Sequence, residues 1–506
     1  MILKQCLTDN AVSKRDIRTN TKHVAVGDVF FCCLKAEQFL TADVLDKASE
    51  VYVESGFFDR NKHFTDYKNK VIETANFNKN LLAELKKTYQ IPSTIMAITG
   101  TKGKTSTSWF VMQILGRCGI KCGYVGTVGA CIFDGKSYHK LNTEDTLTTP
   151  AIDDLYRFFD AMVQQNVQHV IFEASSHALE QDRFGDLHIK IGGFTNLSQD
   201  HLDYHKTMEN YFNAKTLLFK QHQAAGDVAI LNTDDSNFDK LKSICEDKKI
   251  STFEVGGRGK DIKILSTSQH INGQDVELDV NGAKFAFRTD ILGSFQVQNL
   301  SMAMAFAINC GVPASKVLSV VPAVKAPLGR MQRVANEHIF VDYAHTPKSL
   351  EESLKLLKML YEKIVVVFGC GGNRDKQKRP LMFEVANLLS DYVVVTSDNP
   401  RFEVPAEIIA DITCFYFDKE NPLRNDRFVL DEMAKLHSRY TKTTDKVIVI
   451  EDRRDAIRFA VNEYCNMKNN TKIGLLIAGK GHEDYQIFGD KKHHFDDVEE
   501  VENALK

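Results

Sequence analysis

Short apolar runs alternate with longer amphipathic stretches through most of this chain. After residue 93 the apolar runs read STIMAITG, HVIFEAS, IKIGGFTNLS and VAILNTDD, and the segments between them have helical spacing. A second series begins near residue 336 and reads HIFVDYA, KIVVVFGCGG, DYVVVTSD, KVIVIED and KIGLLIAGKG. Such alternation is typical of α/β proteins with parallel sheets. In these sheets ligands bind beyond the carboxyl ends of the strands, so the loops there are the first candidates for chemistry.

The chain divides into three predicted domains. The first ninety or so residues hold short apolar runs, VGDVFFCCL and SEVYVESGFF, and end with LLAELKKTYQ before Pro92. A strand-rich region at 250–295 and the helical segment NLSMAMAFAINCG close the first α/β series. A length of 506 residues suits three domains, at roughly 150 residues each. We therefore predict domains at 1–92, 93–333 and 334–506.

Composition and charge exclude several classes of protein. The sequence is 43% hydrophobic and 26% charged, as in globular proteins, and its net charge of −3 favours neither nucleic acid nor an anionic membrane as a partner. It contains no run of about 18 apolar residues that would predict a membrane span, and MILKQCLTDNAVSKRD lacks the apolar segment of a signal peptide. The 11 cysteines form no C-x-x-C pair, so we expect reduced thiols rather than disulfides. These features predict a cytoplasmic protein.

The stretch ITGTKGKTST follows a predicted strand and opens a predicted helix, as a phosphate-binding loop does. The general loop, G-x-x-x-x-G-K-[ST], would have a glycine where this chain has Ile98; a glycine stands instead at Gly100. Backbone N–H groups of such a loop hold phosphate oxygens, the lysine adds positive charge, and the threonine hydroxyl can reach Mg²⁺. A chance Gly-Lys-Thr in an ordinary turn is the alternative, but the flanking strand and helix favour ATP binding. The predicted ATP-binding residues of the loop are Gly100, Thr101, Lys102, Gly103, Lys104, Thr105 and Ser106.

Polar residues after the next strands are candidate metal ligands. Glu173 ends an apolar run, where it could bind Mg²⁺ or merely precede a helix cap. His201 and His205 are spaced like zinc ligands, but no third ligand is evident, so one imidazole near Mg²⁺ is the better hypothesis. Lys215 and Lys220 lie on an amphipathic stretch, and its periodicity alone predicts two surface lysines.

The C-terminal loops carry charges that suit an amino acid. Arg374 lies in GCGGNRD, Arg401 ends TSDNPR, and AGKGHED supplies Gly479, His482 and Glu483. A guanidinium group binds a carboxylate through two hydrogen bonds, and a glutamate can receive an amine. Either arginine alone could line a solvated turn, but at one sheet edge the two together favour a zwitterionic ligand.

Together these loops resemble the Mur ligase family, ATP-dependent enzymes that add amino acids to bacterial cell-wall precursors. The blocks that carry the resemblance run in the family's order from about residue 95 to 490 and read TGTKGKT, EASSHAL, FTNLSQDHLDYH, NAKTLLF, GRMQRV, DYAHTP and GNRDKQKRPLM. The resemblance implies a three-domain architecture with a central P-loop doubly wound sheet and a C-terminal Rossmann-like domain. Because TGTKGKT is the family's own form of the loop, Ile98 is no defect.

The residues D-N-P-R at 398–401 are similar to the signature of Mur ligases that add meso-diaminopimelate to UDP-N-acetylmuramoyl-L-alanyl-D-glutamate in peptidoglycan precursor synthesis. The implied reaction uses ATP and Mg²⁺ to convert the D-glutamyl γ-carboxylate into an acyl phosphate, which the amine then attacks. Lysine has no second carboxylate, so the guanidinium of an arginine here would stay buried and unpaired when lysine is bound. Arg401 therefore disfavours lysine as the substrate. The family's diaminopimelate contacts fall on Arg374, Asp398, Asn399, Pro400, Arg401, Gly479 and Glu483.

The remaining roles come from the resemblance residue by residue. Lys215 matches the lysine that the family carbamylates to N6-carboxylysine, an anionic Mg²⁺ ligand, which overrides its interpretation as a surface residue. The implied catalytic residues are Lys104, Glu173, His201 and Lys215, and the implied metal ligands are Thr105, Glu173, His201 and the Lys215 carbamate. Further nucleotide contacts fall on Asn299, Arg330 and His345. The UDP-sugar-dipeptide contacts fall on Thr21, Thr148, Thr149, Ser175, Gln181 and Arg183.

The sequence also departs from the family pattern. Asn20, Thr21 and Lys22 stand where the uridine-binding block has D-S-R, KAEQFLTAD replaces a G-x-x-x-D-G loop, and Leu147 replaces an asparagine. The alternatives are the same ligase acting on lysine or on lanthionine, which has two carboxylates, and a nucleotide-binding paralogue without ligase activity. A monomer with small-molecule substrates is expected.

Overall fold

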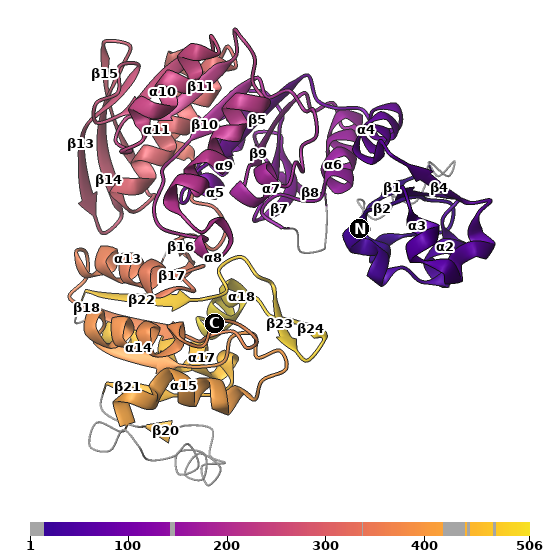
Figure 1. The fold of residues 1–506 in the computed structure, drawn as a ribbon. Helices are drawn as coiled ribbons and strands as arrows, with labels where there is room; N and C mark the ends of the chain where they lie inside the picture. Colours follow the sequence, from indigo (N-terminus) through magenta and orange to yellow (C-terminus); the bar gives the residue numbers. More distant parts are fainter. Residues whose placement is uncertain (1–14, 142–146, 336, 418–440, 443–445, 469–471) are drawn as a thin grey trace. The chain divides into compact units, whose positions relative to one another are not determined.

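The computed structural model describes residues 15–141, 147–335, 337–417, 441–442, 446–468 and 472–506. Its strands form an N-terminal four-stranded sheet, a central 11-stranded sheet, a C-terminal seven-stranded sheet and a hairpin (Figure 1). The predicted α/β class is confirmed. The chain forms two compact units, one of Met1–Ile264, Leu278–Phe285 and Gln298–Val321, the other of Leu265–Glu277, Ala286–Val297 and Pro322–Lys506. The N-terminal sheet shares a unit with most of the central sheet, so the boundaries at residues 92 and 333 stay predictions.

The N-terminal sheet is parallel, in the order β1-β2-β3-β4. Alternate side chains of its second strand enter opposite cores: Phe31 packs with Leu81 and Leu85, and Phe30 packs with Leu45. Both faces are therefore covered, which explains the unbroken apolar run in the sequence. The elements of this part are β1 (Ile17–Arg18), η1 (Thr21–His23), β2 (Val29–Cys32), η2 (Leu34–Phe39), α2 (Ala42–Lys47), β3 (Glu50–Glu54), α3 (Phe57–Arg60), η3 (Lys62–Tyr67), β4 (Val71–Thr74) and α4 (Phe77–Thr88).

The central sheet has the order β15-β14-β13-β12-β11-β10-β5-β9-β6-β7-β8. Strand β5 (Thr94–Thr99) lies between β10 and β9, parallel to both, so the loops after these three strands meet at one edge. The other strands are β6 (Cys122–Gly126), β7 (Gly129–Phe133), β8 (Tyr138–Lys140), β9 (His169–Glu173), β10 (Ile191–Phe194), β11 (Val228–Asn232), β12 (Ser251–Gly256), β13 (Ile262–His270), β14 (Gly273–Val280) and β15 (Ala283–Thr289).

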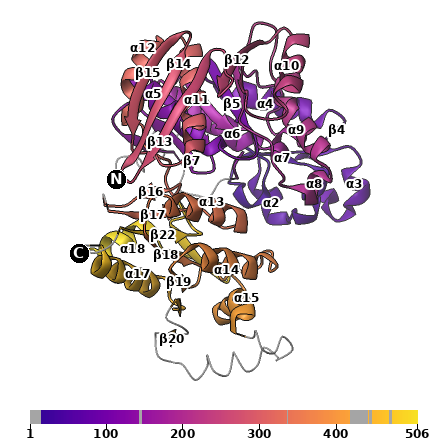
Figure 2. The same cartoon turned by 90° about the vertical axis from the view of Figure 1, so that its left-hand side faces the viewer.

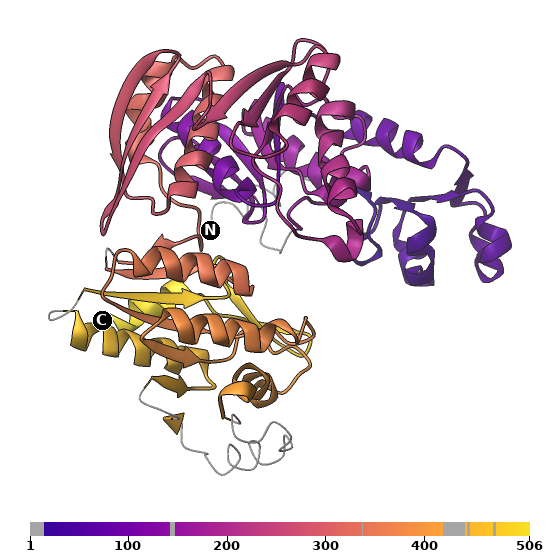
Figure 3. The same cartoon turned by 60° about the vertical axis from the view of Figure 1, so that its left-hand side comes forward.

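Helices flank this sheet, and α5 (Lys104–Arg117) follows β5 directly. Every residue from Thr105 to Leu115 is buried, so α5 is a core helix rather than an amphipathic surface helix. The long strands β13, β14 and β15 stand side by side at the upper left of Figure 3. The remaining helices are α6 (Ile152–Gln164), α7 (Ser176–Glu180), α8 (Leu202–His205), α9 (Met208–Gln221), α10 (Phe238–Asp247), α11 (Ser294–Asn309), α12 (Ala314–Val320) and η4 (Val321–Ala323).

The C-terminal sheet has the order β16-β17-β22-β18-β19-β21-β20, with parallel inner strands and an antiparallel strand at each edge. Figure 2 shows its strands between α13 and α14 on one side and α17 and α18 on the other, which matches two separate apolar cores. Its strands and the hairpin are β16 (Gln332–Arg333), β17 (Ile339–Asp342), β18 (Lys363–Phe368), β19 (Tyr392–Val395), β20 (Thr441–Lys442), β21 (Val447–Val449), β22 (Ile473–Ala478), β23 (Tyr485–Phe488) and β24 (Lys491–His494). Its helices are α13 (Pro347–Lys358), α14 (Lys378–Leu389), α15 (Pro405–Phe417), α17 (Arg453–Met467) and α18 (Asp497–Ala504).

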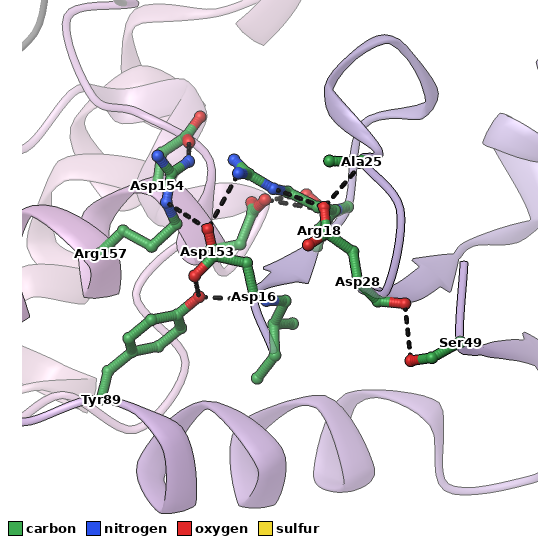
Figure 4. A network of polar contacts seen from close by, with 11 residues as sticks. Asp16, Arg18, Ala25, Asp28, Ser49, Tyr89, Asp153, Asp154 and Arg157 are labelled. Atoms are coloured by element: carbon green, nitrogen blue, oxygen red, sulfur yellow. Dashed lines mark hydrogen bonds and ion pairs between the residues drawn. The ribbon is translucent and has the colours of Figure 1, made fainter. Parts of the chain in front are cut away.

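A polar network ties the N-terminal sheet to α4 and α6 (Figure 4). The Tyr89 hydroxyl of α4's C-cap accepts from the Ile17 N–H at 3.0 Å and donates to Asp16 at 3.1 Å. The side chain of Thr19 and its backbone N–H both donate to the Asp153 carboxylate of α6, at 2.6 and 3.0 Å. The segment before the N-terminal turn is therefore fixed on the helix that follows the Thr148-Thr149 loop.

Two expectations about the chain as a whole can be compared with the described residues. Nine cysteines of the described part are free, as expected for reduced thiols. Over those same residues, no helix combines the length and the apolar character needed to cross a bilayer.

Candidate active site

The phosphate-loop candidate follows β5 and requires both of its glycines. Gly100 has φ +145°, and a Cβ there would lie 1.8 Å from Thr195 Oγ1. Gly103 caps α5 with φ +85°, and a Cβ there would lie 2.4 Å from Asn299 Oδ1. Ile98 is fully buried within β5, so a glycine at that position would be a strand residue and not part of the turn. The structure thus explains why the first glycine stands two positions later.

Two lysine amines converge on one carbonyl of this loop. Lys104 Nζ donates to the carbonyl oxygens of Gly100 at 2.9 Å and Thr101 at 3.0 Å. Lys215 Nζ, from α9, donates to the same Gly100 oxygen at 2.7 Å. Two amine nitrogens therefore lie together at the helix N-terminus where an anion would bind.

Lys215 is a buried residue, so its interpretation as a surface lysine is wrong, whereas Lys220 is exposed as expected. Lys215 is 1% exposed, and its amine lies 4.4 Å from the centre of the Tyr211 ring. Burial, with the nearby Lys104 charge, lowers the pKa of Lys215 well below the ordinary lysine value. Periodicity missed this because α9 is buried on more of its surface than the one face that an amphipathic pattern predicts. The result is an amine that readily loses its proton and becomes nucleophilic.

Glu173 lies at the end of β9, beside the phosphate-loop candidate. The register pairs Ile98 of β5 with Glu173, and Thr105 Oγ1 donates to Glu173 Oε2 at 2.9 Å. The carboxylate also accepts from the Tyr124 hydroxyl at 2.6 Å and from the Thr127 N–H at 2.9 Å. Sequence reasoning missed Tyr124 and Thr127, since only the glycine-containing turn GTVG marks that segment. The site offers hard oxygen donors, from a threonine hydroxyl and a carboxylate, of the kind that Mg²⁺ prefers.

His201 and His205 do not form a zinc pair. His201 has φ +52° and precedes the four-residue helix α8, and its ring lies beside the His177 ring at 4.9 Å. His205 is buried and its Nε2 lies 2.9 Å from Ser176 Oγ. No cluster of three or more His, Cys, Asp or Glu side chains suited to a metal occurs in the described part of the chain.

The residues predicted to hold the UDP-sugar dipeptide surround the start of α7. The Thr149 hydroxyl donates to the Glu173 carbonyl oxygen at 2.7 Å and accepts from the Ser175 N–H at 3.0 Å. Arg183 donates to the Thr149 carbonyl oxygen at 3.0 Å and, through two nitrogens, to Gln181 Oε1. Thr148 Oγ1 lies 3.3 Å from Thr127 Oγ1. Four of the predicted residues are thereby connected and Thr148 contacts Thr127, whereas Thr21 lies in η1, next to Asn20, which caps that turn.

The diaminopimelate candidates gather at the carboxyl edge of the C-terminal sheet. Strands β22, β18 and β19 are neighbours, and their loops begin at residues 479, 369 and 396. Asn399 Nδ2 donates to Glu483 Oε2 at 2.8 Å, which joins the loop after β19 to the loop after β22. Gly479 has φ +119°, and a Cβ there would lie 2.6 Å from Asp398 Oδ2.

The two predicted arginines flank one glycine. A Cβ on Gly371 would lie 2.8 Å from Arg401 Nη1 and 3.6 Å from Arg374 Cγ. Arg401 has φ +53°, and its Nη1 donates to the Gly372 carbonyl oxygen at 3.0 Å. Pro400 approaches the same turn so closely that a Cβ on Gly372 would lie 1.9 Å from the Pro400 oxygen. The glycine turn therefore lets the D-N-P-R loop, the Arg401 guanidinium and the side chain of Arg374 approach one another.

Buried charges support this edge, and sequence reasoning missed them. Lys480 is fully buried, with Nζ 3.5 Å from Glu483 Oε2 and 3.4 Å from Asn399 Oδ1. Arg453 pairs with Asp497 at 2.8 Å, both side chains being buried, and donates to the Ala478 carbonyl oxygen at 3.0 Å. Their signal in the sequence is weak, because charged residues next to strand ends usually lie in solvent.

The three remaining nucleotide candidates lie in different units. Asn299, on α11, contacts the position of Gly103 in the first unit. Arg330 stacks over the Tyr343 ring at 4.6 Å, and His345 Nδ1 lies 2.8 Å from the Tyr343 carbonyl oxygen, both in the second unit. The structure therefore connects Asn299 directly with the phosphate-loop candidate.

Comparisons with known proteins match nearly the whole chain. Residues 98–307 match the family model of the Mur ligase middle domain, and residues 329–481 match that of the Mur ligase glutamate ligase domain. A UDP-N-acetylmuramoyl-L-alanyl-D-glutamate–2,6-diaminopimelate ligase of Rickettsia bellii is 36% identical over 501 residues, covering 98% of this chain and 96% of the relative.

Solved structures agree. A structure of a UDP-N-acetylmuramoyl-L-alanyl-D-glutamate–2,6-diaminopimelate ligase is 28% identical with a TM-score of 0.61, covering 99% of this chain and 98% of its own. The MurF ligase of Thermotoga maritima in complex with ADP shares the fold at 15% identity, with a TM-score of 0.55 and 97% of each chain covered.

Proposed function

The chain belongs to the Mur ligase family, and we propose that it is the ATP-dependent ligase that joins meso-diaminopimelate to the D-glutamyl γ-carboxylate of UDP-N-acetylmuramoyl-L-alanyl-D-glutamate. The observation that carries the proposal is the meeting of Lys104 and the buried amine of Lys215 at Gly100, beside the Thr105–Glu173 contact. Similarity along the full length to relatives named for this reaction supports it.

Mg²⁺ is the cofactor that this set of side chains suits. Thr105 Oγ1 and Glu173 Oε2 are hard oxygen donors 2.9 Å apart. The depressed pKa of Lys215 supports its conversion to a carbamate: the neutral amine attacks CO₂, releases a proton and becomes an anionic oxygen ligand. His201 is the imidazole proposed to complete the ligand set. When bound, Mg²⁺ neutralises the negative charge that develops on the phosphoryl group.

Phosphoryl transfer from ATP to the γ-carboxylate needs alignment and charge neutralisation rather than a protein nucleophile. Lys104 and the N–H groups at the start of α5 hold the phosphates, and Asn299 supports the Gly103 turn. The group formed by Thr149, Ser175 and Arg183 orients the acceptor dipeptide beside Glu173. These residues position the carboxylate, which forms a bond to phosphorus while the bond to ADP breaks.

The amine of diaminopimelate then attacks the acyl carbon and phosphate leaves. Glu483, held by Asn399, suits an ammonium group, and Arg401 and Arg374 suit a carboxylate. Lysine lacks the second carboxylate, so it would leave the guanidinium unpaired. Lanthionine has that carboxylate and is the second candidate substrate, favoured by the same two arginines.

The test is ADP and phosphate formation from Mg·ATP and UDP-N-acetylmuramoyl-L-alanyl-D-glutamate, with and without meso-diaminopimelate, followed by the mass of the nucleotide product. We expect phosphate release only with the amino acid, and a product heavier by one diaminopimelyl residue. ATP binding without amino-acid-dependent release would instead identify a nucleotide-binding paralogue that has lost ligase activity.

A further inference from the structure

The Glu173 carboxylate receives a hydrogen bond from a tyrosine that belongs to none of the sequence blocks discussed above. Tyr124, on β6, donates its hydroxyl proton to Glu173 Oε1 at 2.6 Å, the shortest of the contacts to this carboxylate. We propose that Tyr124 is a positioning residue that fixes the Glu173 carboxylate so that Oε2 is directed to the Thr105 hydroxyl and to the Mg²⁺ site there. The inference rests on the proposed function, since that function includes the metal.

The two carboxylate oxygens have different partners. Oε1 accepts from the Tyr124 hydroxyl and from the Thr127 N–H at 2.9 Å. Oε2 accepts from Thr105 Oγ1 at 2.9 Å and from Thr127 Oγ1 at 3.2 Å. A carboxylate oxygen has about two lone-pair positions, and each oxygen accepts two hydrogen bonds, but both donors of Oε1 come from β6 and the turn after it. Oε2 is the oxygen that faces the phosphate-loop candidate.

The direction of the Tyr124 hydroxyl is fixed from both sides. Its oxygen accepts a hydrogen bond from the Val128 N–H at 3.2 Å, so its own proton is available for Glu173. The ring is fully buried, with its edge against Trp109 of α5 at 5.6 Å. A phenol confined in this way has little freedom, so the bond to Glu173 loses little entropy on formation.

The contact depends on a glycine beside it. A Cβ at Gly126 would lie 2.3 Å from Glu173 Oε1 and 2.5 Å from the Tyr124 hydroxyl oxygen. Any larger residue at position 126 would displace one of these two groups. Residues 124–127 therefore form a binding site for one carboxylate oxygen. The Tyr124 hydroxyl and the Thr127 N–H donate hydrogen bonds to it, and the absence of a Cβ at Gly126 leaves room for it.

This arrangement has a functional consequence. Groups that orient metal ligands typically change metal affinity or activity by about 10- to 100-fold when they are removed. Without the phenol, Oε1 keeps only the hydrogen bond from the Thr127 N–H, so the carboxylate turns more easily about its terminal torsion and the direction of Oε2 toward Thr105 is less well fixed. The substitution Tyr124→Phe removes only the hydroxyl and keeps the ring against Trp109.

The chain offers a matched control in Tyr156. Its ring is also fully buried, on α6, and within the described residues its hydroxyl has no hydrogen-bond partner. Tyr156→Phe therefore removes a buried hydroxyl that makes no hydrogen bond to the described residues of the site.

Three measurements on the full chain test the proposal: Mn²⁺ binding followed by electron paramagnetic resonance, the Mg²⁺ activation constant with kcat, and thermal unfolding without metal. For Tyr124→Phe we expect Mn²⁺ affinity to fall about 10-fold or more, the Mg²⁺ activation constant to rise in parallel, and kcat to recover at saturating Mg²⁺. The KM for diaminopimelate should stay at the wild-type value, and the unfolding temperature should fall by no more than the loss of the two buried hydrogen bonds of Tyr124 predicts. Tyr156→Phe should keep the wild-type Mn²⁺ affinity and kinetic constants.

Other results separate the inference from the proposed function. Unchanged Mn²⁺ affinity in Tyr124→Phe, or a fall in unfolding temperature that shifts every constant together, would overturn the positioning role. A different outcome would be a wild-type protein without amino-acid-dependent phosphate release that still binds Mn²⁺ more tightly than Tyr124→Phe does. That outcome would overturn the proposed function and support the role of Tyr124.

Discussion

At the scale of single residues, a glycine of the phosphate-loop candidate and a glycine that follows α5 share a backbone conformation but differ in what surrounds them. Gly103 and Gly119 have nearly equal φ angles, +85° and +86°, but a Cβ would clash with Asn299 only at Gly103 and meets nothing within 4 Å at Gly119. This pair separates backbone strain from steric exclusion.

Alanine at either position should cost about 1–2 kcal/mol of stability, because both adopt the left-handed conformation. Only Gly103→Ala should also displace Asn299 and weaken ATP binding severely, as measured by calorimetry beside chemical unfolding. Equal ATP affinities in the two variants would contradict the role given to the Gly103–Asn299 approach.

In the proposed mechanism, the metal chemistry depends on Lys215. Because burial lowers its pKa, the folded protein holds a neutral amine at a lower pH than free lysine does, and CO₂ adds only to that form. Lys215→Arg stays cationic and cannot form a carbamate, so we expect activity to fall by about 100-fold or more. Lys220→Arg, on the exposed side of α9, should behave as wild type.

The carbamate itself is observable with ¹³C-bicarbonate as a carbonyl resonance that is present in wild type and absent in Lys215→Arg. Activity should also decline as the pH falls through the pKa of Lys215 in the folded protein, since protonation removes the nucleophilic amine. Full activity of Lys215→Arg would show that no carbamate is needed.

At the scale of elements, Asp153 connects α6 to the N-terminal sheet. Burial raises the pKa of Asp153 although Thr19 donates two hydrogen bonds to it. A carboxyl whose pKa is raised in the folded state binds its proton more tightly there than in the unfolded chain. Its contribution to stability is therefore largest below the unfolded pKa and is lost as the pH rises through the folded pKa.

Asp153→Asn should remove this dependence while leaving an acceptor for Thr19. We expect its unfolding temperature relative to wild type to be higher at pH 7 than at pH 4. Asp154→Asn removes only a smaller cause of the raised pKa of Asp153 and should therefore weaken the wild-type trend without abolishing it. A constant difference between Asp153→Asn and wild type across this range would refute the assignment.

The buried pair of Arg453 and Asp497 stabilises the C-terminal sheet edge. Removing one partner of a buried pair typically costs about 3–5 kcal/mol, because the other charge stays buried. Asp497→Ala should therefore lower the free energy of unfolding by that amount in urea titrations and weaken diaminopimelate binding, since Arg453 also contacts the Ala478 carbonyl.

An exposed pair on the same two helices is the control. Arg454 is about half exposed and binds Glu500 at 2.9 Å. Glu500→Ala should change stability by no more than about 1 kcal/mol. If both variants lose the same stability, burial is not what distinguishes the two pairs.

At the scale of the whole molecule, the sequence predicted the fold class because strand and helix patterns alternate and glycine loops follow the strands. The phosphate-loop candidate and Glu173 were predictable for the same reason: each directly follows a strand, and the register brings them together. The roles of Tyr124, Lys480 and Arg453 were not predictable, because each has a partner far away in the sequence. Glu173 lies 49 residues from Tyr124, Asn399 lies 81 residues from Lys480, and Asp497 lies 44 residues from Arg453. The burial of Lys215 escaped periodicity but not family resemblance, because resemblance records a role that the local pattern does not.

The central claim, a ligase selective for meso-diaminopimelate, is tested most directly by kcat/KM for phosphate release with meso-diaminopimelate, lysine and lanthionine. A site that pairs two arginines with a second carboxylate should reject lysine by about 10⁴-fold. Arg401→Ala should remove most of that preference, and lanthionine should remain a substrate. Equal or greater kcat/KM with lysine would contradict the account.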